Sequence, residues 1–430
     1  MKLLDSILWA SATILILYSG IFYTFKLKFV QFRFIDMFKN LFKKTDSKVS
    51  PFESLMIVLG GRIGVGSIAG IALSIYLGGV GSIFWMWIIG FISAPLSFSE
   101  TILGIKYQKK VNDEYIGGPS NYLKYGLNKP NLSKLYSFII VFSYIGGFLS
   151  IQANTITTSI VNYININPLI IGITLALISF IIILGGVNNI SKVSKYLVPI
   201  MSLIYILASF FIIVINYEKV PLVFMNILSD AFNFKSFGFG VISSMIVGIQ
   251  RGIFSNEAGL GTGAIAASCV NSNPASCGFV QMIGIYITTF LICTATALVI
   301  LTTDNIDVNV INGIELTQEA FIMNLGSLGN IVVILSIILF AFSTVLSGYY
   351  DGEASLKSIF PNISKNKLLI LKIVTFVVIL FGSITKANLI WSFVNILTSL
   401  LAIINSYALI KLYKEVVFEY KRYNKCGKIK

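Results

Sequence analysis

Two short stretches of glycine and polar residues interrupt apolar helical segments of the sequence. Residues 255–263 read Ser-Asn-Glu-Ala-Gly-Leu-Gly-Thr-Gly, and residues 60–67 read Gly-Gly-Arg-Ile-Gly-Val-Gly-Ser. Hydrocarbon offers no water to free N–H and C=O groups, so a membrane helix is broken only where it lines a cavity or a ligand site. Glycines alone more often indicate close helix packing. Two such breaks at corresponding places in two halves of a chain favour a binding site at the middle of the bilayer.

The composition indicates an integral membrane protein. Hydrophobic residues make up 56% of the 430 residues and charged residues 12%, and several apolar runs reach the roughly 20 residues that span hydrocarbon. The polar stretches have the length of loops, so we expect one domain, residues 1–430. The sequence contains no histidine, and its four cysteines show no CxxC spacing. This excludes His-based catalysis and His-ligated metals.

Eleven apolar runs predict an all-α protein with about 11 transmembrane helices. They are residues 7–25, 52–77, 80–105, 135–162, 168–187, 194–216, 236–268, 276–302, 328–350, 366–384 and 388–412. The first run lacks a cleavage site, so we expect it to be retained. Basic residues gather after the first and third spans and in the tail, which predicts an N-terminus outside and a C-terminus inside. The formal charge of +14 then reflects topology and contact with anionic membrane lipids rather than nucleic acid.

Ten of the spans divide into two groups of five, and each group begins with a broken helix. Residues 52–216 form the first group and residues 236–412 the second. Residues 1–51 add a helix and a basic cytoplasmic loop, and residues 413–430 form a basic cytoplasmic tail. An odd number of spans per group makes the second group inverted relative to the first. We therefore expect a 5+5 inverted repeat.

Several motifs, in order along nearly the whole chain, resemble the alanine or glycine:cation symporter family. They are Gly61 to Gly70 (GRIGVGSIAG), Phe84-Trp85-Met86-Trp87, Gly117-Gly118-Pro119, Gln152-x-Asn154, Gln250 to Gly261 with its SNEAGLG block, and Cys293 to Ile300. The resemblance implies sodium-coupled uptake of a small neutral amino acid, on the inverted-repeat fold shared with the bacterial leucine transporter. It also implies a bacterial inner membrane location.

The two breaks suit a zwitterionic amino acid. Backbone N–H groups and a positive helix end solvate a carboxylate, whereas carbonyls and a negative helix end solvate an ammonium. We assign the carboxylate to the first break and the ammonium to the second, with Val65 and Phe254 enclosing a small apolar pocket. Gly66 is expected to be irreplaceable because of its N–H group and its torsions. The predicted substrate-binding residues are Gly64, Val65, Gly66, Ser67, Gln152, Phe254, Ser255 and Asn256.

Ser343 and Thr344 are adjacent hydroxyls in an apolar run. By themselves they would be read as hydroxyls bonded to nearby carbonyls. The resemblance implies instead that they coordinate sodium, which prefers hard oxygen ligands. The predicted sodium ligands are Gly60, Ile63, Phe340, Ser343 and Thr344, and no organic cofactor is expected.

Charged side chains at membrane depth are functional by default. We expect Arg62 and Glu257 to pair or to cap broken backbone, and Glu100 to pair with a loop lysine. Asp351, where the family commonly has Tyr, is expected to be a solvated loop charge. The family commonly reads Thr-Gly-Asn where this chain has Val65-Gly66-Ser67, so the substrate preference stays open.

Other classes of function fit the sequence less well. A channel would need a repeated filter loop or rings of charge, an enzyme a nucleophile with its base, and an ATP-driven pump a P-loop. None of these is evident in the sequence. Proton coupling, with another small amino acid, remains the alternative to sodium, and no obligatory protein partner is evident.

Overall fold

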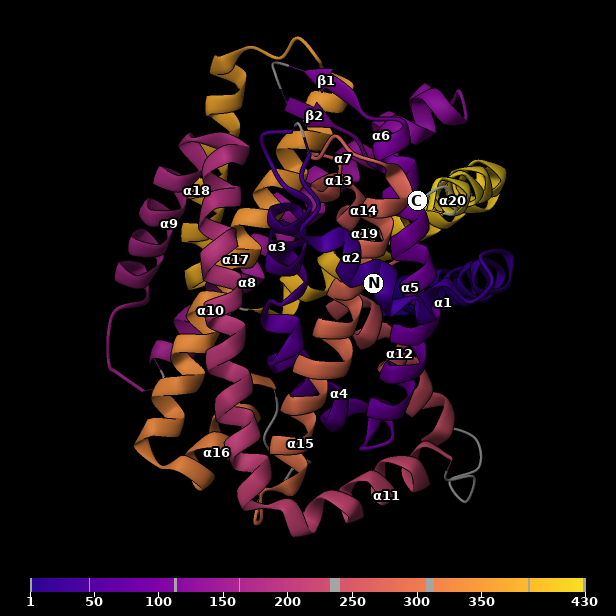
Figure 1. Ribbon diagram of the computed structural model, residues 1–430. Helices are drawn as coiled ribbons and strands as arrows, with labels where there is room; N and C mark the ends of the chain where they lie inside the picture. Colours follow the sequence, from indigo (N-terminus) through magenta and orange to yellow (C-terminus); the bar gives the residue numbers. More distant parts are fainter. Residues whose placement is uncertain are drawn as a thin grey trace.

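The computed structural model describes residues 2–45, 47–111, 114–161, 163–232, 240–306, 313–385 and 387–427, which form a bundle of long helices (Figure 1). Every predicted span contains helix. The helices are α1 (Lys2–Lys26), α3 (Pro51–Arg62) with α4 (Ala69–Gly78), α5 (Ser82–Lys106), α7 (Pro130–Ile140) with α8 (Leu149–Val161), α9 (Pro168–Leu184), α10 (Gly186–Ile215), α12 (Gly240–Asn256) with α13 (Thr262–Ala267), α14 (Pro274–Ile285) with α15 (Thr294–Thr302), α17 (Ser327–Ile359), α18 (Lys365–Ile384) and α19 (Ala387–Lys411).

Eight helical stretches within the described residues are long and apolar enough to cross a membrane. The other three predicted spans contain α9 and the two broken pairs, whose helices have 17 residues or fewer. Residues 236–239 of the seventh span, and Lys428 and Lys430 of the tail, lie outside the described residues. The number eleven, the orientation and the inverted repeat stay predictions.

Several elements occupy segments that were expected to be loops. They are α2 (Phe34–Leu41), strands β1 (Lys109–Val111) and β2 (Glu114–Ile116) of one antiparallel hairpin, α6 (Pro119–Asn121), α11 (Val220–Ala231), α16 (Gly313–Leu325) and α20 (Tyr413–Gly427). α17 also continues nine residues beyond the predicted end at 350, because Tyr349 donates to Glu353 and Glu353 pairs with Lys357 one turn further on. Such pairs four residues apart stabilise a helix that is no longer apolar.

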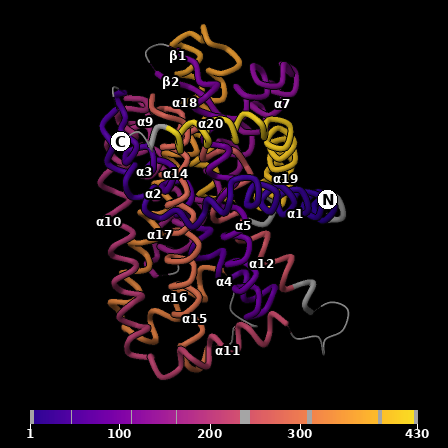
Figure 2. The backbone as a smooth tube through the Cα atoms, turned by 45° about the vertical axis from the view of Figure 1, so that its right-hand side comes forward, coloured from indigo at the N-terminus to yellow at the C-terminus, as the bar shows by residue number. Residues whose placement is uncertain are grey.

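Close packing holds α12, the helix that leads into the second break, against α5. A Cβ atom at Gly248 would lie 2.2 Å from the carbonyl oxygen of Ser82, and one at Gly252 would lie 2.4 Å from Ile89. Small residues four apart let membrane helices approach closely. These two glycines of α12 therefore pack helices. α1, the helix outside both predicted repeats, lies along α19 and α5 (Figure 2).

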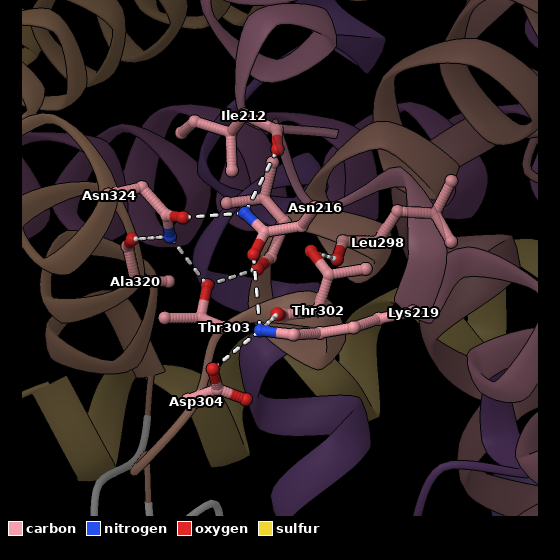
Figure 3. A network of polar contacts seen from close by, with 10 residues as sticks. Ile212, Asn216, Lys219, Leu298, Thr302, Thr303, Asp304, Ala320 and Asn324 are labelled. Carbon is pink, nitrogen blue, oxygen red and sulfur yellow. Dashed lines mark hydrogen bonds and ion pairs between the residues drawn. The ribbon is translucent and has the colours of Figure 1, made fainter. Parts of the chain in front are cut away.

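Different polar contacts join neighbouring elements at the two ends of the bundle. At the end that carries the β-hairpin, called the hairpin end, Lys357 of α17 pairs with Glu114 at 2.6 Å. At the opposite end, called the α11 end, Lys219 lies 2.6 Å from Asp304 and donates to Asn216, while Asn216 donates to Asn324 of α16 at 2.7 Å (Figure 3). This network ties α10, α15 and α16 together.

Candidate functional site

The first break separates α3 from α4 by one tight turn. α3 ends at Arg62, a 3₁₀ turn covers Val65–Ser67, and the N–H of Ser67 donates to the Gly64 carbonyl at 3.1 Å. A Cβ atom at Gly64 would lie 2.5 Å from the hydroxyl oxygen of Thr344 in α17. Glycine is required here because α17 approaches so closely.

Two hydroxyls of α17 meet the last turn of α3. The hydroxyl oxygen of Ser343 lies 3.0 Å from the Gly60 carbonyl and 2.8 Å from the Phe340 carbonyl. The corresponding distances for Thr344 are 2.9 Å and 3.0 Å. These four buried oxygens form a compact cluster, called the oxygen cluster. Ile63 is also buried, but its N–H donates to Leu59, and no described contact joins Ile63 to the cluster.

The second break is built from left-handed backbone. α12 ends at Asn256, and φ is +53° at Glu257, +94° at Gly259 and +91° at Gly261 before α13 begins at Thr262. L-residues rarely adopt such torsions, and glycine adopts them readily. The side chain of Asn256 accepts from the N–H of Ala258 at 3.0 Å, which satisfies one of the backbone donors that the break frees.

Glu257 and Arg62 are both buried, but they do not form the expected pair. Glu257 accepts from Tyr144 and from Thr262, each at 2.9 Å. Arg62 donates to the Gln281 carbonyl at 3.1 Å and to Ser97 at 3.0 Å. No ion pair within 4 Å joins these two described residues. Each charge instead holds its own break to a neighbouring helix.

The two breaks touch one another inside the bundle. The hydroxyl oxygens of Ser67 and Ser255 are 3.1 Å apart, and a Cβ atom at Gly66 would lie 3.2 Å from the Phe254 ring. The structure thus brings the first break to Phe254 and Ser255. Gly66 is not among the glycines with positive φ, so the torsional reason given for it is wrong, and space is the constraint.

Two other predicted residues have partners that the sequence did not indicate. Gln152 of α8 accepts from the N–H of Val65 at 3.2 Å. Asn256 donates to Ser93 of α5 at 3.3 Å, so its side chain is engaged away from the first break. Asn154, two residues after Gln152 in α8, donates to the Thr385 carbonyl at the end of α18, which is a contact between helices.

Sequence reasoning missed an aromatic wall and two polar neighbours of the site. Phe254 stacks on Phe148 with ring centroids 5.0 Å apart and packs against Trp391 at 5.1 Å. Ser255 lies 3.1 Å from the Cys293 sulfur, and Thr296 donates to the Ser67 carbonyl. Phe148 and Cys293 are the last residues of two π-helical segments, Val141–Phe148 and Tyr286–Cys293, and such irregularities are frequent at functional sites.

Two expectations about acidic residues are wrong. Glu100 is fully buried and accepts from Asn405 at 2.5 Å, whereas the nearby Lys106 pairs with Glu415 and Glu419 of α20. Asp351 is only 2% exposed, because α17 continues past it and other helices cover it. The apolar runs indicate where the spans end, but they do not show that α17 continues as a buried helix beyond its apolar part.

The helical bundle with its two broken helices has the fold of solved sodium-coupled transporters. The chain superposes on a structure of MhsT in complex with L-phenylalanine with a TM-score of 0.55 and 14% identity, covering 87% of this chain and 100% of that one. A Na⁺-coupled sialic acid symporter gives a TM-score of 0.52 at 14% identity, with coverage of 93% and 82%. These likenesses concern the fold alone.

The sequence profile of the sodium:alanine symporter family matches residues 1–430, and the chain belongs to that family. The chain is 35% identical to the probable sodium/glutamine symporter GlnT of Bacillus subtilis, covering 99% of this chain and 91% of GlnT. It is 34% identical to the sodium/alanine symporter AgcS of Methanococcus maripaludis, with 99% and 96% covered. The protein is therefore a multi-pass membrane transporter and not an enzyme, and the family implies sodium-coupled amino acid symport.

Proposed function

We propose that the protein takes up alanine, glycine or a similarly small neutral amino acid together with sodium, by alternating access. The observation that carries this proposal is the meeting of the two breaks, at Ser67 and Ser255, beside the oxygen cluster of α17. Broken helices place free backbone groups and both signs of helix dipole at one point. A zwitterionic amino acid binds to both, because its carboxylate needs N–H groups and a positive helix end, and its ammonium needs carbonyls and a negative helix end.

We place the substrate where the two breaks meet, and this assignment is supported by the contacts between them. The carboxylate takes the N–H groups of Val65, Gly66 and Ser67, and the ammonium takes the carbonyls of Phe254 and Ser255. The N–H of Val65 now donates to Gln152, and the N–H of Ser67 donates to the Gly64 carbonyl. A bound carboxylate replaces both acceptors with charge-assisted hydrogen bonds, which are roughly twice as strong as neutral ones.

Sodium binds at the oxygen cluster, and its binding stabilises the substrate site. Gly60 is in the last turn of α3, four residues before Gly64, and Thr344 lies against both. An ion bound between Gly60, Phe340, Ser343 and Thr344 therefore fixes the turn whose N–H groups bind the carboxylate. Linkage requires the converse, so substrate must raise the affinity for sodium by the same factor.

The tightness of the contact between Gly66 and Phe254 favours a small substrate. Phe254 is held by Phe148 and Trp391, so the ring has little freedom to withdraw from a larger side chain. Among the relatives, one is named for alanine and another for glutamine, so family membership leaves the substrate open. The packing of this chain favours alanine or glycine.

Uptake into proteoliposomes with imposed gradients tests the proposal. Labelled alanine is supplied with an inward sodium gradient at equal pH, or with an inward proton gradient without sodium, and a panel of neutral amino acids competes. We expect saturable uptake under the sodium gradient, inhibited most by alanine, glycine or serine. Uptake driven only by the proton gradient would show that protons, and not sodium, are the coupling ion. Leucine uptake insensitive to alanine would contradict the substrate assignment.

A further inference from the structure

One face of α17 carries a row of buried polar side chains. Ser343, Ser347, Asp351 and Ser355 are spaced four residues apart and are each at most 2% exposed. Residues four apart lie on one face of a helix, about 6 Å further along its axis at each step. The row begins at the oxygen cluster and runs toward the hairpin end, where α17 closes on β2 through Lys357 and Glu114.

Asp351 lacks the partners that a buried carboxylate requires. Glu257 accepts a hydrogen bond on each carboxylate oxygen, and Glu100 accepts one on Oε1, while its Oε2 has no partner among the described residues. No described group donates to the carboxylate of Asp351, and its buried Oδ1 has no partner. The hydroxyl of Ser355, one turn on, also has none. Leaving a buried charge unpaired costs far more than leaving it in water. The arrangement indicates a ligand that neutralises Asp351.

The charges around the row leave an excess of negative charge. The charged side chains that interact electrostatically with Asp351 are Glu257, at the second break, and Arg62, at the end of α3. The hydroxyl of Ser347 and the carboxylate of Glu257 lie 2.9 Å and 3.7 Å from the point where a Cβ atom of Gly61 would be. Two carboxylates with one guanidinium favour one additional cation, and the nearby hydroxyls supply the oxygen ligands that a hard cation prefers.

We propose that this face of α17 is the path by which sodium passes between the oxygen cluster and the hairpin end, with Asp351 as a transient sodium ligand on it. The inference rests on the proposed function, because it requires sodium at Ser343 and Thr344. Asp351 is about two turns, roughly 12 Å, from Ser343. The ion moves from the cluster to Ser347 and Asp351, and leaves past Ser355 at the hairpin end.

The test compares Asp351→Asn with Glu100→Gln, which also converts a buried acid into its amide but lies on α5. The full chain is reconstituted in proteoliposomes, and the initial rates of labelled alanine uptake and labelled sodium flux are measured. Thermal stabilisation by alanine plus sodium reports occupancy of the main sites in the same preparations. We expect Asp351→Asn to keep that stabilisation and to lower both rates about tenfold, because loss of ligand charge weakens cation binding.

A second pair of variants removes hydroxyls of the same helix. Ser347→Ala lies on the proposed path, whereas Ser336→Ala removes a buried hydroxyl on the other side of the oxygen cluster. We expect only Ser347→Ala to slow the sodium flux. This pair decides the question if Asp351→Asn fails to fold, since equal rates in the two serine variants would overturn the path.

Several outcomes would overturn the inference without touching the proposed function. They are parental flux in Asp351→Asn, an equal loss in Glu100→Gln, and a sodium flux that stays normal while only a proton-driven flux is lost. By contrast, the absence of sodium-dependent alanine uptake in the parent protein would contradict the proposed function itself. Sodium-dependent alanine uptake by the parent protein therefore distinguishes a failure of this inference from a failure of the proposed function.

Discussion

The two broken helices are held open by different means. The first break contains no left-handed residue among its described torsions, and it is held from outside, by the hydroxyls of Ser343 and Thr344 on α17. The second break has three left-handed residues in five positions. Tyr136 donates to its Leu260 carbonyl at 2.5 Å, and Tyr144 donates to Glu257 at 2.9 Å.

This difference separates a break that another helix holds from one that its own backbone torsions shape. Left-handed torsions are a local property, which the glycines of the second break adopt readily. Oxygen atoms contributed by another helix hold the first break only while the two helices stay together. We therefore expect sodium to control the first break, and the second to act as the fixed wall against which it moves.

The largest effect is expected from adding a methyl group to the second break. Gly261→Ala places a Cβ atom at φ +91°, 2.3 Å from Pro119 and 2.7 Å from the Tyr136 hydroxyl. Backbone strain and overpacking each cost about 1–3 kcal/mol, so folded yield and thermal stability in detergent should fall severely, with or without sodium.

The matched control for this change lies beside the first break. Gly70→Ala adds the same methyl group at the start of α4, where nothing lies within 4 Å, and alanine favours helix by about 1 kcal/mol over glycine. We expect parental or slightly raised stability. Equal damage in both variants would contradict the distinction drawn between the breaks.

The next largest effect concerns the point where the breaks touch. Gly66→Leu would press a side chain against Phe254 and shield the N–H groups assigned to the carboxylate. The variant should fold but lose the thermal stabilisation that alanine plus sodium gives the parent, because a ligand stabilises only the state it binds. A variant that never folds would indicate a packing role, and one stabilised like the parent would remove Gly66 from the site.

A smaller effect is expected from removing the hydroxyls that hold the first break. Ser343→Ala combined with Thr344→Ala should raise the sodium concentration for half-maximal uptake about tenfold or more, equivalent to about 1.4 kcal/mol for each factor of ten. Thr375→Ala is the control, because its hydroxyl bonds only the Leu371 carbonyl of its own helix. Unchanged sodium activation at equal expression would place the ion elsewhere.

The sequence predicts the transport class and the approximate place of each long helix, because both depend on local signals. Apolar runs locate spans whose environment is hydrocarbon, and glycine with polar residues marks both breaks. The ends of elements depend on contacts instead. α17 passes residue 350 because Glu353 and Lys357 pair along it, and α20 begins where only a basic tail was expected, with Glu415 and Glu419 paired to Lys106 of α5.

The candidate site was predictable where the chain supplies its own backbone, and less so where distant helices contribute. Gly64, Gly66 and Ser255 carry their signal in the breaks. Trp391 and Cys293 reach the site from α19 and from the π-helical segment before α15. Nothing local distinguishes Trp391 from other apolar residues, and Cys293 begins a family motif that by itself does not indicate contact with the second break. Buried charges show the same limit, since Glu100 and Asp351 look like helix-end charges until their neighbours are known.

The smallest effect is expected at the pocket wall that each break contributes. Val65 belongs to the first break, and Phe254 lies in α12 just before the second break, with its ring packed against Phe148 and Trp391. In the parent, alanine and glycine should compete better than leucine, and they should differ little from each other, since one methylene is worth only about 1–3 kcal/mol. Val65→Ala removes two carbon atoms and lets the pocket bury at least one more carbon of leucine, so leucine should inhibit alanine uptake at least about fourfold better, at roughly 0.8 kcal/mol for each buried carbon. Sodium activation should not change, because the side chain of Val65 is outside the oxygen cluster. A variant that discriminates against leucine as strongly as the parent would move the size limit to the fixed wall at Phe254.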